Sequence, residues 1–419
     1  MPMPIPVTSD PRGAIFLDPA AYADPARWHA IAAELRREAP VLRVEADGYE
    51  PLWALTRHAD VFEVSRRHDR WHNTQRSQVM PEWLWAFIVG QGINPRTLVH
   101  LDGTEHRDHR NVANDWFKPA AVRHRQGDID AIADAYVQKM VDLGGECDFA
   151  QDIAVPYTLR VIMSIFGVPE EDEPIMLRLT QGIFGAADPE YLGDLGSPAE
   201  LGTRAIAEFG DYFGALADDR RRHPTDDLAT VIANGQIDGC PLDRDAELWY
   251  FIIVATAGHD TTSYALSGGL EALLRHPDQL AAVGADPSLA TPAAEEMIRW
   301  TSPVRHFLRQ AQEDTELHGQ AIAAGERVLL SYWSANRDED VFADPMRFDV
   351  HRADLTDSIA FGIGAHHCLG SQVARRELRT FLPKLLDRME AIELAGEPQW
   401  VEANFVGGVK HLPVRYRVR

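Results

Sequence analysis

Cysteine is scarce in this sequence, with only three residues, at positions 147, 240 and 368, in 419. Three thiols cannot all pair within one chain, and none belongs to a C-x-x-C segment. Neither a disulfide framework nor a zinc ribbon is therefore supported. At least one of the thiols needs another explanation.

Long apolar runs are also missing. The best run, residues 161–168, is far shorter than the roughly 18–20 apolar residues that cross a bilayer. Residues 1–15 include Pro4, Asp10 and Arg12 instead of a basic start followed by an apolar stretch, so no secretory signal is expected. We therefore expect a cytoplasmic protein that does not span a membrane.

Positive charge is in the minority, because 41 Lys and Arg face 64 Asp and Glu, which gives a formal net charge of -23. Nucleic acids and anionic membranes require clustered positive charge, so neither is an expected partner. Basic residues gather only locally, at 106–110, 220–223 and 375–379, and solvated helix faces would explain each group equally well.

Apolar residues are plentiful, at 45% of the chain with ten Trp and 16 Phe, so a large core can be buried. No repeat, linker or low-complexity tract divides the sequence, and residues 1–419 are expected to form a single domain. Apolar residues at every third or fourth position predict helices at 25–37, 120–143, 156–166, 201–222, 243–275, 292–300 and 371–389. Alternating segments predict strands at 41–45, 51–55, 315–317, 327–330 and 412–418. The pattern predicts a mainly α fold with minor β sheets.

Residues 243–275 predict an unusually long helix, roughly 50 Å at ~1.5 Å per residue. Asp243 is suited to cap its start, and Pro277 follows its end. Residues 251–258 are apolar nearly all round, which indicates burial on most sides. We expect this helix to run through the centre of the molecule.

The strongest local signal is the glycine-framed loop at 361–370, Phe-Gly-Ile-Gly-Ala-His-His-Cys-Leu-Gly. Its glycines allow tight turns or the close approach of a flat group. Cys368 stands just before the helix expected at 371–389, where the helix dipole and free backbone N–H groups stabilise a thiolate.

Three other interpretations of this loop compete. A dinucleotide-binding loop would need a third glycine at position 367, where this chain has His. A metal site made from His366, His367 and Cys368 would require adjacent side chains to converge on one ion. A structural free cysteine is the ordinary explanation of any lone Cys, but it leaves the glycine frame unexplained.

The loop resembles the haem-binding signature of the cytochromes P-450, F-G-x-G-x-H-x-C-x-G. The resemblance implies the cytochrome P-450 fold, a triangular helical body with a long central helix over haem b, and the activity of a haem-thiolate monooxygenase. It implies that Cys368 binds the iron and that His366 reaches a haem propionate. Thiolate ligation favours O–O cleavage. The matching residues are Phe361, Gly362, Gly364, His366, Cys368 and Gly370.

A second motif lies within the long predicted helix. Residues 257–262, Ala-Gly-His-Asp-Thr-Thr, resemble the family's oxygen-activation motif A-G-x-[D/E]-T-T. The hydroxyl of Thr261 can bond the carbonyl of Ala257, which tends to bend a helix, and close helix packing would also explain Gly258. The resemblance implies that Ala257 and Gly258 lie against the haem. It also implies that Thr261 hydrogen-bonds bound dioxygen and that Asp260 relays protons.

Glu296 and Arg299 stand three apart on one face of a predicted helix, a spacing that most often makes a surface salt bridge. The segment is similar to the family's E-x-x-R. Residues 335–352 resemble the meander that follows it and supplies a second arginine, here Arg352. The resemblance implies a structural triad of Glu296, Arg299 and Arg352 behind the haem.

Three further residues resemble propionate contacts of the family. His106 and Arg110 are similar to the H-x-x-x-R of one helix, although Gly103 stands where many members have proline. Arg309 resembles a strand arginine that pairs with a propionate. Solvated surface charges are the alternative interpretation of each.

The resemblance also implies the partners. Dioxygen is a substrate, and electrons would come from a ferredoxin with its NAD(P)H-dependent reductase, because no flavin or nicotinamide motif follows the haem region. An acidic ferredoxin needs a basic docking patch, for which Arg110, Arg375, Arg376 and Arg379 are the candidates. We expect the chain to act as a monomer.

The substrate is indicated less directly. Framework segments such as 47–53 and 404–408 resemble the α-terpineol hydroxylase subfamily. A small hydrophobic substrate, a monoterpenoid or similar alicyclic or aromatic compound, is expected, with a steroid or branched fatty acid as the alternative. The aromatic run at 83–87 is expected either in a variable substrate loop or in ordinary core packing. By position in the motifs, the pocket is expected to include Ile253, Thr256, Ala257, Phe307 and Val406.

Two other classes remain open at the level of sequence. A peroxide-driven peroxygenase would typically lack the pair Asp260 and Thr261. A haem-based gas sensor or carrier would not need that pair either. Turnover with ferredoxin, reductase and NADH separates a monooxygenase from both.

Overall fold

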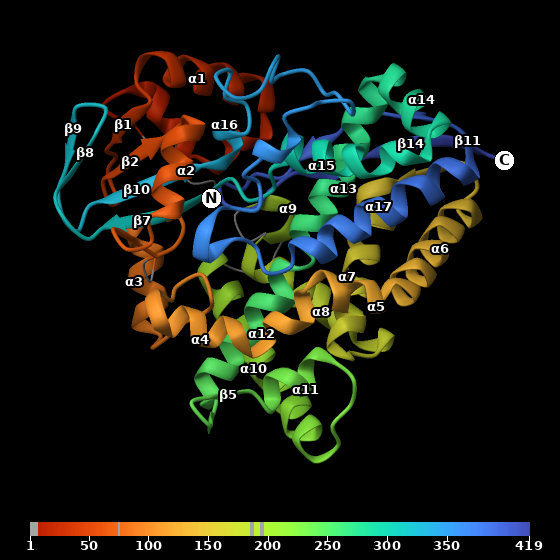
Figure 1. Cartoon of the computed structure of the whole chain (residues 1–419), viewed down its shortest axis with the longest axis horizontal. Helices are drawn as coiled ribbons and strands as arrows, with labels where there is room; N and C mark the ends of the chain where they lie inside the picture. Colours follow the sequence, from red (N-terminus) through yellow and green to blue (C-terminus); the bar gives the residue numbers. More distant parts are fainter. Residues whose placement is uncertain (1–6, 74–75, 185–187, 193–196) are drawn as a thin grey trace.

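The computed structural model describes residues 7–73, 76–184, 188–192 and 197–419. Figure 1 shows a broad helical body that narrows toward α11, with the N-terminal sheet on one side and both α13 and α17 inside the body. The fold is mainly α with small sheets, as the periodicity predicts.

The helices, in chain order, are α1 (Pro25–Glu38), α2 (His58–Arg66), α3 (Glu82–Gly90), α4 (Gly103–Asn114), α5 (Pro119–His124), α6 (Gln126–Asp142), α7 (Val155–Phe166), α8 (Glu173–Phe184), α9 (Pro189–Leu192), α10 (Pro198–Arg222), α11 (Leu228–Ala233), α12 (Arg244–Ala257), α13 (Asp260–Arg275), α14 (Pro277–Ala285), α15 (Ala290–Thr301), α16 (Tyr332–Ala335) and α17 (Ser371–Arg388). The strands are β1 (Val41–Val44), β2 (Leu52–Leu55), β3 (Trp71–His72), β4 (Glu146–Asp148), β5 (Gln236–Ile237), β6 (Cys240–Pro241), β7 (His306–Ala311), β8 (Thr315–Leu317), β9 (Gln320–Ile322), β10 (Arg327–Ser331), β11 (Met389–Leu394), β12 (Gln399–Trp400), β13 (Val409–His411) and β14 (Pro413–Val418).

The largest sheet has the order β1-β2-β10-β7-β3. Strand β10 runs parallel to β2 and antiparallel to β7, with Leu329 opposite Ala54 on one side and Leu308 on the other. A second sheet, β11-β14-β4, joins the C-terminus to the segment before α7. Strand β7 carries Phe307 and Arg309, so the larger sheet fixes one wall of the site described below.

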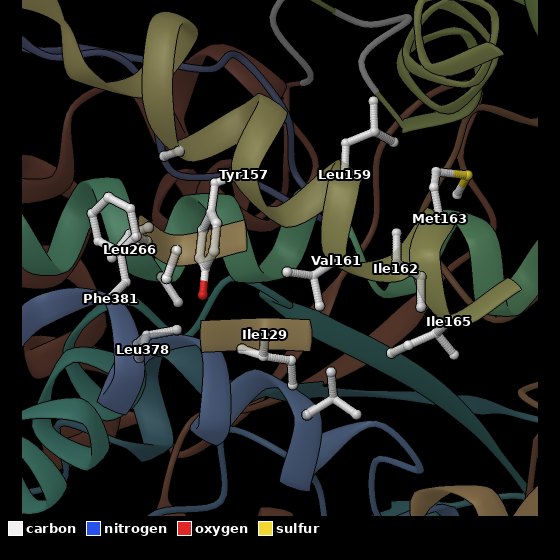
Figure 2. Packing of buried hydrophobic residues seen from close by; sticks show 14 of the residues in the cluster. Ile129, Tyr157, Leu159, Val161, Ile162, Met163, Ile165, Leu266, Leu378 and Phe381 are labelled. Atoms are coloured by element: carbon white, nitrogen blue, oxygen red, sulfur yellow. The ribbon is translucent and has the colours of Figure 1, made fainter. Parts of the chain in front are cut away.

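The main core surrounds α7, which lies between α6, α13 and α17 (Figure 2). Val161 of α7, Leu266 of α13 and Phe381 of α17 all belong to this cluster of buried residues. The Tyr157 hydroxyl donates to the carbonyl of Glu377 at 3.1 Å, which ties α7 directly to α17. Helices α7 and α17, which both border the cavity described below, are thus held by one continuous core.

The expected long helix at 243–275 is wrong as a single element, because α12 ends at Ala257 and α13 begins at Asp260. The Thr261 hydroxyl donates to the carbonyl of Ala257 at 2.8 Å, and the hydroxyl of Thr262 donates to that of Gly258 at 3.4 Å. Side-chain donors thus serve carbonyls at the end of α12, where the helix is interrupted. Asp243 caps α12, as predicted, by accepting from the N–H of Ala246.

Other boundaries differ less. The helix expected at 120–143 divides into α5 and α6 around Arg125. The resemblance implied the helix that carries His106 and Arg110 and the strand that carries Arg309. The elements that had not been predicted are α2, α3, α8, α9, α11, α14, α16, β3, β4, β5, β6, β9, β11, β12 and β13.

Candidate functional site

A cavity of about 1180 Å³ lies beside the break between α12 and α13. Its walls include α3, β7, the loop at 361–370 and the first turn of α17. Pockets for one small ligand measure ~300–1,000 Å³, so this space can hold more than one group. The two motif segments that the sequence singled out therefore border the same cavity.

The loop at 361–370 turns Cys368 toward this cavity. Gly362 and Gly364 have φ values of 69° and 75°, which favour glycine, and the N–H of Cys368 donates to the carbonyl of Phe361 at 2.8 Å. A Cβ at Gly364 would lie 3.1 Å from the carbonyl oxygen of Ser65, so a larger residue would also crowd α2. The Cys368 side chain lies deep in the protein, and its surface is exposed to the open cavity rather than to the outside of the molecule.

The surroundings of the Cys368 thiol act on its ionisation in two directions. Burial raises its pKa, while the backbone N–H of Gly370 and the charges of Arg110 and Arg375 lower it. The N–H groups at the start of α17 suit a thiolate better than a thiol. A metal cation at the sulfur would remove the proton outright.

A basic cluster borders the same cavity: His106 and Arg110 of α4, Arg309 of β7, and His366. The rings of His106 and His366 lie 4.0 Å apart, and the amide nitrogen of Asn73 lies 3.0 Å from Nδ1 of His366. Arg110 Nη2 donates to the carbonyl of His367 at 2.7 Å. The structure thus brings together residues from three segments that are far apart in sequence.

One carboxylate, that of Asp102, lies 3.8 Å from Nε2 of His366, and the other donors of this cluster are short of acceptors. Within the described residues, Nε2 of His106 is buried without a hydrogen-bond partner, and the recorded hydrogen bond of the buried Arg309 guanidinium is to the carbonyl of Leu308. Burial lowers the pKa of His106 to about 3, with the nearby charges of His366 and Arg110 acting in the same direction, and burial lowers that of Arg309 as well. A carboxylate placed among these donors would accept their hydrogen bonds and offset the free-energy cost of burying them without partners. The donor set, the sulfur and the cavity volume together fit a haem with two propionates.

The opposite wall is formed at the helix break. Ala257, Gly258 and Thr261 border the cavity, and a Cβ at Gly258 would lie 2.8 Å from Cδ1 of Ile162 on α7. Close helix packing therefore explains that glycine by itself. Asp260 does not border the cavity: it is only 6% exposed, and its Oδ2 has no hydrogen-bond partner among the described residues.

Glu296 and Arg299 form an ion pair in which both side chains are 0% exposed, so the surface-bridge interpretation is wrong for this pair. Arg299 Nε and Nη2 donate to the two carboxylate oxygens at 2.6 and 2.8 Å, and its Nη1 donates to the carbonyl of Asn336 at 2.8 Å. Arg352 Nε reaches Glu296 at 3.4 Å. The three residues join α15 to the long segment before the Cys368 loop.

The two parallel hydrogen bonds from the Arg299 guanidinium to Glu296 lead to a prediction about the free energy of unfolding. Arg299→Lys is expected to lower the free energy of unfolding by about 2–3 kcal/mol, because a lysine cannot make the two parallel bonds to Glu296 and still reach Asn336. Urea unfolding measures the loss. Arg415→Lys is the control, since Arg415 pairs with Glu146 on the surface and should change stability by at most ~1 kcal/mol. Equal effects of the two substitutions would refute the assignment of a structural role to the buried pair.

All five expected pocket residues, Ile253, Thr256, Ala257, Phe307 and Val406, line the cavity. Of the aromatic run, Trp83 and Trp85 line it too, and no residue of α3 is buried, so the substrate-loop interpretation fits better than core packing. The sequence patterns missed several lining residues, since no motif marks them: Ser77, His100, Ile183, Ile206, Trp249 and Asn404.

Most of the arginines expected in the docking patch already have partners within the protein. Arg375 Nε pairs with Glu295 at 2.9 Å, Arg379 pairs with the same carboxylate, and Arg110 points inward to His367. Arg376 alone of the four has no recorded partner in the part of the chain that the structure describes. Three of the four expected docking residues thus interact within the chain, and the docking patch itself stays a prediction.

No described helix is both long enough and apolar enough to cross a bilayer. The sequence model of a family described as cytochrome P450 matches residues 289–414. The chain is 39% identical over 410 residues to cytochrome P450-terp of a Pseudomonas species, covering 95% of each chain.

More distant relatives have different names. Linalool 8-monooxygenase of Pseudomonas putida is 32% identical, covering 92% of this chain and 95% of the relative. Steroid C26-monooxygenase of Rhodococcus jostii is also 32% identical, covering 97% and 85%. The crystal structure of CYP108D1 from Novosphingobium aromaticivorans matches with a TM-score of 0.91 and 40% identity over 100% of both chains.

Proposed function

The chain belongs to the cytochrome P450 family and is a haem-dependent monooxygenase, and from that premise we propose which residues carry the reaction and what they act on. Cys368 would bind the iron of haem b, and His106, Arg110, Arg309 and His366 would hold its propionates. The observation that carries this proposal is that one cavity is bordered by the only cysteine in the glycine-framed loop and by the acceptor-poor basic cluster.

When bound, the haem supplies the oxygen and electron-transfer chemistry by which one oxygen atom enters the substrate and the other leaves as water. The side chains of the protein position the reacting groups and transfer the protons. The Thr261 hydroxyl donates to the carbonyl of Ala257, so its oxygen can accept a hydrogen bond from a water molecule in the cavity. Asp260 lies directly behind it and provides the titratable group of the relay.

The substrate we propose is a monoterpenoid or a similarly compact alicyclic or aromatic compound. The cavity walls contributed by α3, α12 and β7 are mainly apolar, and P450-terp and linalool 8-monooxygenase are among the relatives. Relatives named steroid C26-monooxygenase and methyl-branched lipid omega-hydroxylase make a steroid or a branched fatty acid the second candidate.

A spectral titration tests the substrate class. Monoterpenoids such as α-terpineol, a steroid and a branched fatty acid are each added to the purified haem protein, and the low-spin to high-spin change is measured. We expect saturable shifts with monoterpenoids at concentrations at least ~10-fold below those needed for the other two classes, since a poorly fitting ligand loses about 1.4 kcal/mol for each tenfold. A steroid or fatty acid that binds more tightly would overturn the preference, and product analysis with ferredoxin, reductase and NADH would exclude a sensor or carrier.

We also propose that a ferredoxin delivers the electrons near Arg376. Because Arg375 and Arg379 are paired with Glu295, the free charge of this surface is small, and docking should be weak and dependent on ionic strength.

Reversing the charge at Arg376 gives the corresponding prediction. Arg376→Glu is expected to slow electron delivery roughly threefold to tenfold at low ionic strength, with the difference shrinking as salt is added. Stopped-flow reduction by the ferredoxin measures this rate. Arg415→Glu, on strand β14, serves as the control and should leave the rate unchanged; an equal loss in both variants would point to net charge rather than to a docking site.

A further inference from the structure

His259 occupies the variable position of the motif at 257–262. Its side chain is 0% exposed and lies at the break between α12 and α13, next to Asp260. A buried imidazole without a metal must have each of its nitrogens matched to a suitable partner.

Both ring nitrogens face oxygen acceptors. Nε2 lies 3.1 Å from the carbonyl oxygen of Val155 on α7, which can only accept, so this nitrogen carries a proton. Nδ1 lies 3.1 Å from Oδ1 of Asp260 and 3.4 Å from the hydroxyl of Thr180 on α8. The Thr180 hydroxyl donates to the carbonyl of Leu177 at 3.0 Å, so its oxygen also offers lone pairs to the ring.

The number of protons on the His259 ring limits how it can contact Asp260. A neutral imidazole has one N–H, which the Val155 carbonyl takes, and Nδ1 would then face the Asp260 carboxylate with no proton between them. A further proton shared by the pair, either as imidazolium with carboxylate or as neutral ring with carboxylic acid, would let Nδ1 donate to Asp260. Around the pair, Glu173 of α8 and Arg160 of α7 form an ion pair, while Tyr191 and Tyr264 face Asp260.

The two oxygens of Asp260 consequently differ. Oδ1 lies 3.1 Å from Nδ1 of His259, whereas Oδ2 is buried with no partner among the described residues. We propose that His259 is a positioning residue that shares one proton with Asp260, fixes Oδ1 and leaves Oδ2 as the atom that exchanges protons. This inference rests on the proposed role of Asp260 in the relay.

The proton balance of this arrangement is simple. A proton from solvent first binds Oδ2 and then leaves it toward the cavity, so that the pair ends with the one shared proton with which it began. The proton shared with Nδ1 stays in place and keeps Asp260 from becoming an uncompensated buried anion in between. Without His259, Asp260 would lose the donor beside Oδ1 that compensates its charge after each transfer.

Two variants separate this role from a merely structural one. His259→Asn places an amide nitrogen near the position of Nδ1 and keeps a donor for Asp260, but it loses the bond to Val155. His259→Gln extends to the position of Nε2 and keeps the bond to Val155, but it leaves Asp260 without its donor. The measurement is the fraction of NADH electrons recovered in hydroxylated product rather than in hydrogen peroxide.

We expect His259→Gln to lower that fraction roughly tenfold, the scale of losing a hydrogen bond to a charged group, and His259→Asn to keep most of it. Thermal unfolding should show the opposite order, with His259→Asn the less stable variant. Equal losses in both variants, or a larger loss in His259→Asn, would overturn the proposal.

A readout independent of turnover is the infrared band of the Asp260 carboxyl group, either the carbonyl band of the acid or the stretching band of the carboxylate, assigned to Asp260 by its absence in Asp260→Asn. Its frequency is expected to shift in His259→Gln and to stay close to that of the unmodified protein in His259→Asn. An unshifted band in His259→Gln would contradict the shared proton. If all variants instead lacked the spectrum of a thiolate-bound haem, the proposed function itself would have failed, which is a distinguishable result.

Discussion

Cys368→Ser is expected to abolish hydroxylation with ferredoxin, reductase and NADH, while the chain still folds. The reason is that the Cys368 sulfur is the only thiol at the cavity, and a neutral hydroxyl cannot replace an anionic ligand that donates electron density. Haem content, the absorption spectrum of the reduced carbon monoxide complex and product formation are measured on the same preparation. Circular dichroism confirms that the helices remain.

Cys147→Ser and Cys240→Ser provide matched controls. Cys147 is half-buried on β4 and Cys240 is exposed on β6, and neither borders the cavity. Both variants should keep the spectrum and the activity of the unmodified protein. Retention of hydroxylation by Cys368→Ser, or its loss in either control, would contradict the assignment of the ligand.

The second large effect is expected at the helix break. Asp260→Asn and Thr261→Ala should each lower product formation about 10²–10⁴-fold, the range over which a positioned acid–base group acts. NADH and oxygen should still be consumed, with hydrogen peroxide as the product, because electron delivery does not pass through these side chains. Product, peroxide and NADH are measured together so that uncoupling is separated from simple inactivity.

Asp245→Asn is the control for this pair. Asp245 is an exposed acid in the first turn of α12, at the opposite end of that helix from the cavity motif. It should leave the coupling of NADH to product unchanged. Full coupling in Asp260→Asn would remove Asp260 from the proton relay and, with it, the reason for His259 to hold that carboxylate.

The sequence could predict those parts of the site that depend on local spacing. The glycines at 362 and 364 adopt positive φ, Thr261 bonds Ala257, and Asp243 caps α12, because each of these features involves residues a few positions apart. Residues placed by motif offset, such as Phe307 and Val406, do line the cavity. The residue roles carried over from the family remain proposals that the experiments above test.

Other features depend on tertiary contacts that no local pattern encodes. The interruption of the long helix follows from carbonyls bonded by Thr261 and Thr262, although the apolar pattern continues through it. Glu295 could not be foreseen as the partner of Arg375 and Arg379, since 80 and 84 residues separate them. For the same reason, the sequence could not show that Asp260 lies behind the cavity wall or that Thr180 and Val155 enclose His259.

The absorption spectrum of the purified, reduced and carbon monoxide-saturated protein tests the central claim most directly. A thiolate bound to the haem iron would shift the Soret band of the carbon monoxide complex strongly to longer wavelength, to about 450 nm. The account predicts this band in the unmodified protein with one haem per chain. A purified chain that binds no haem, or one whose carbonyl complex shows only the shorter-wavelength band of a haem with a neutral axial ligand, would contradict it.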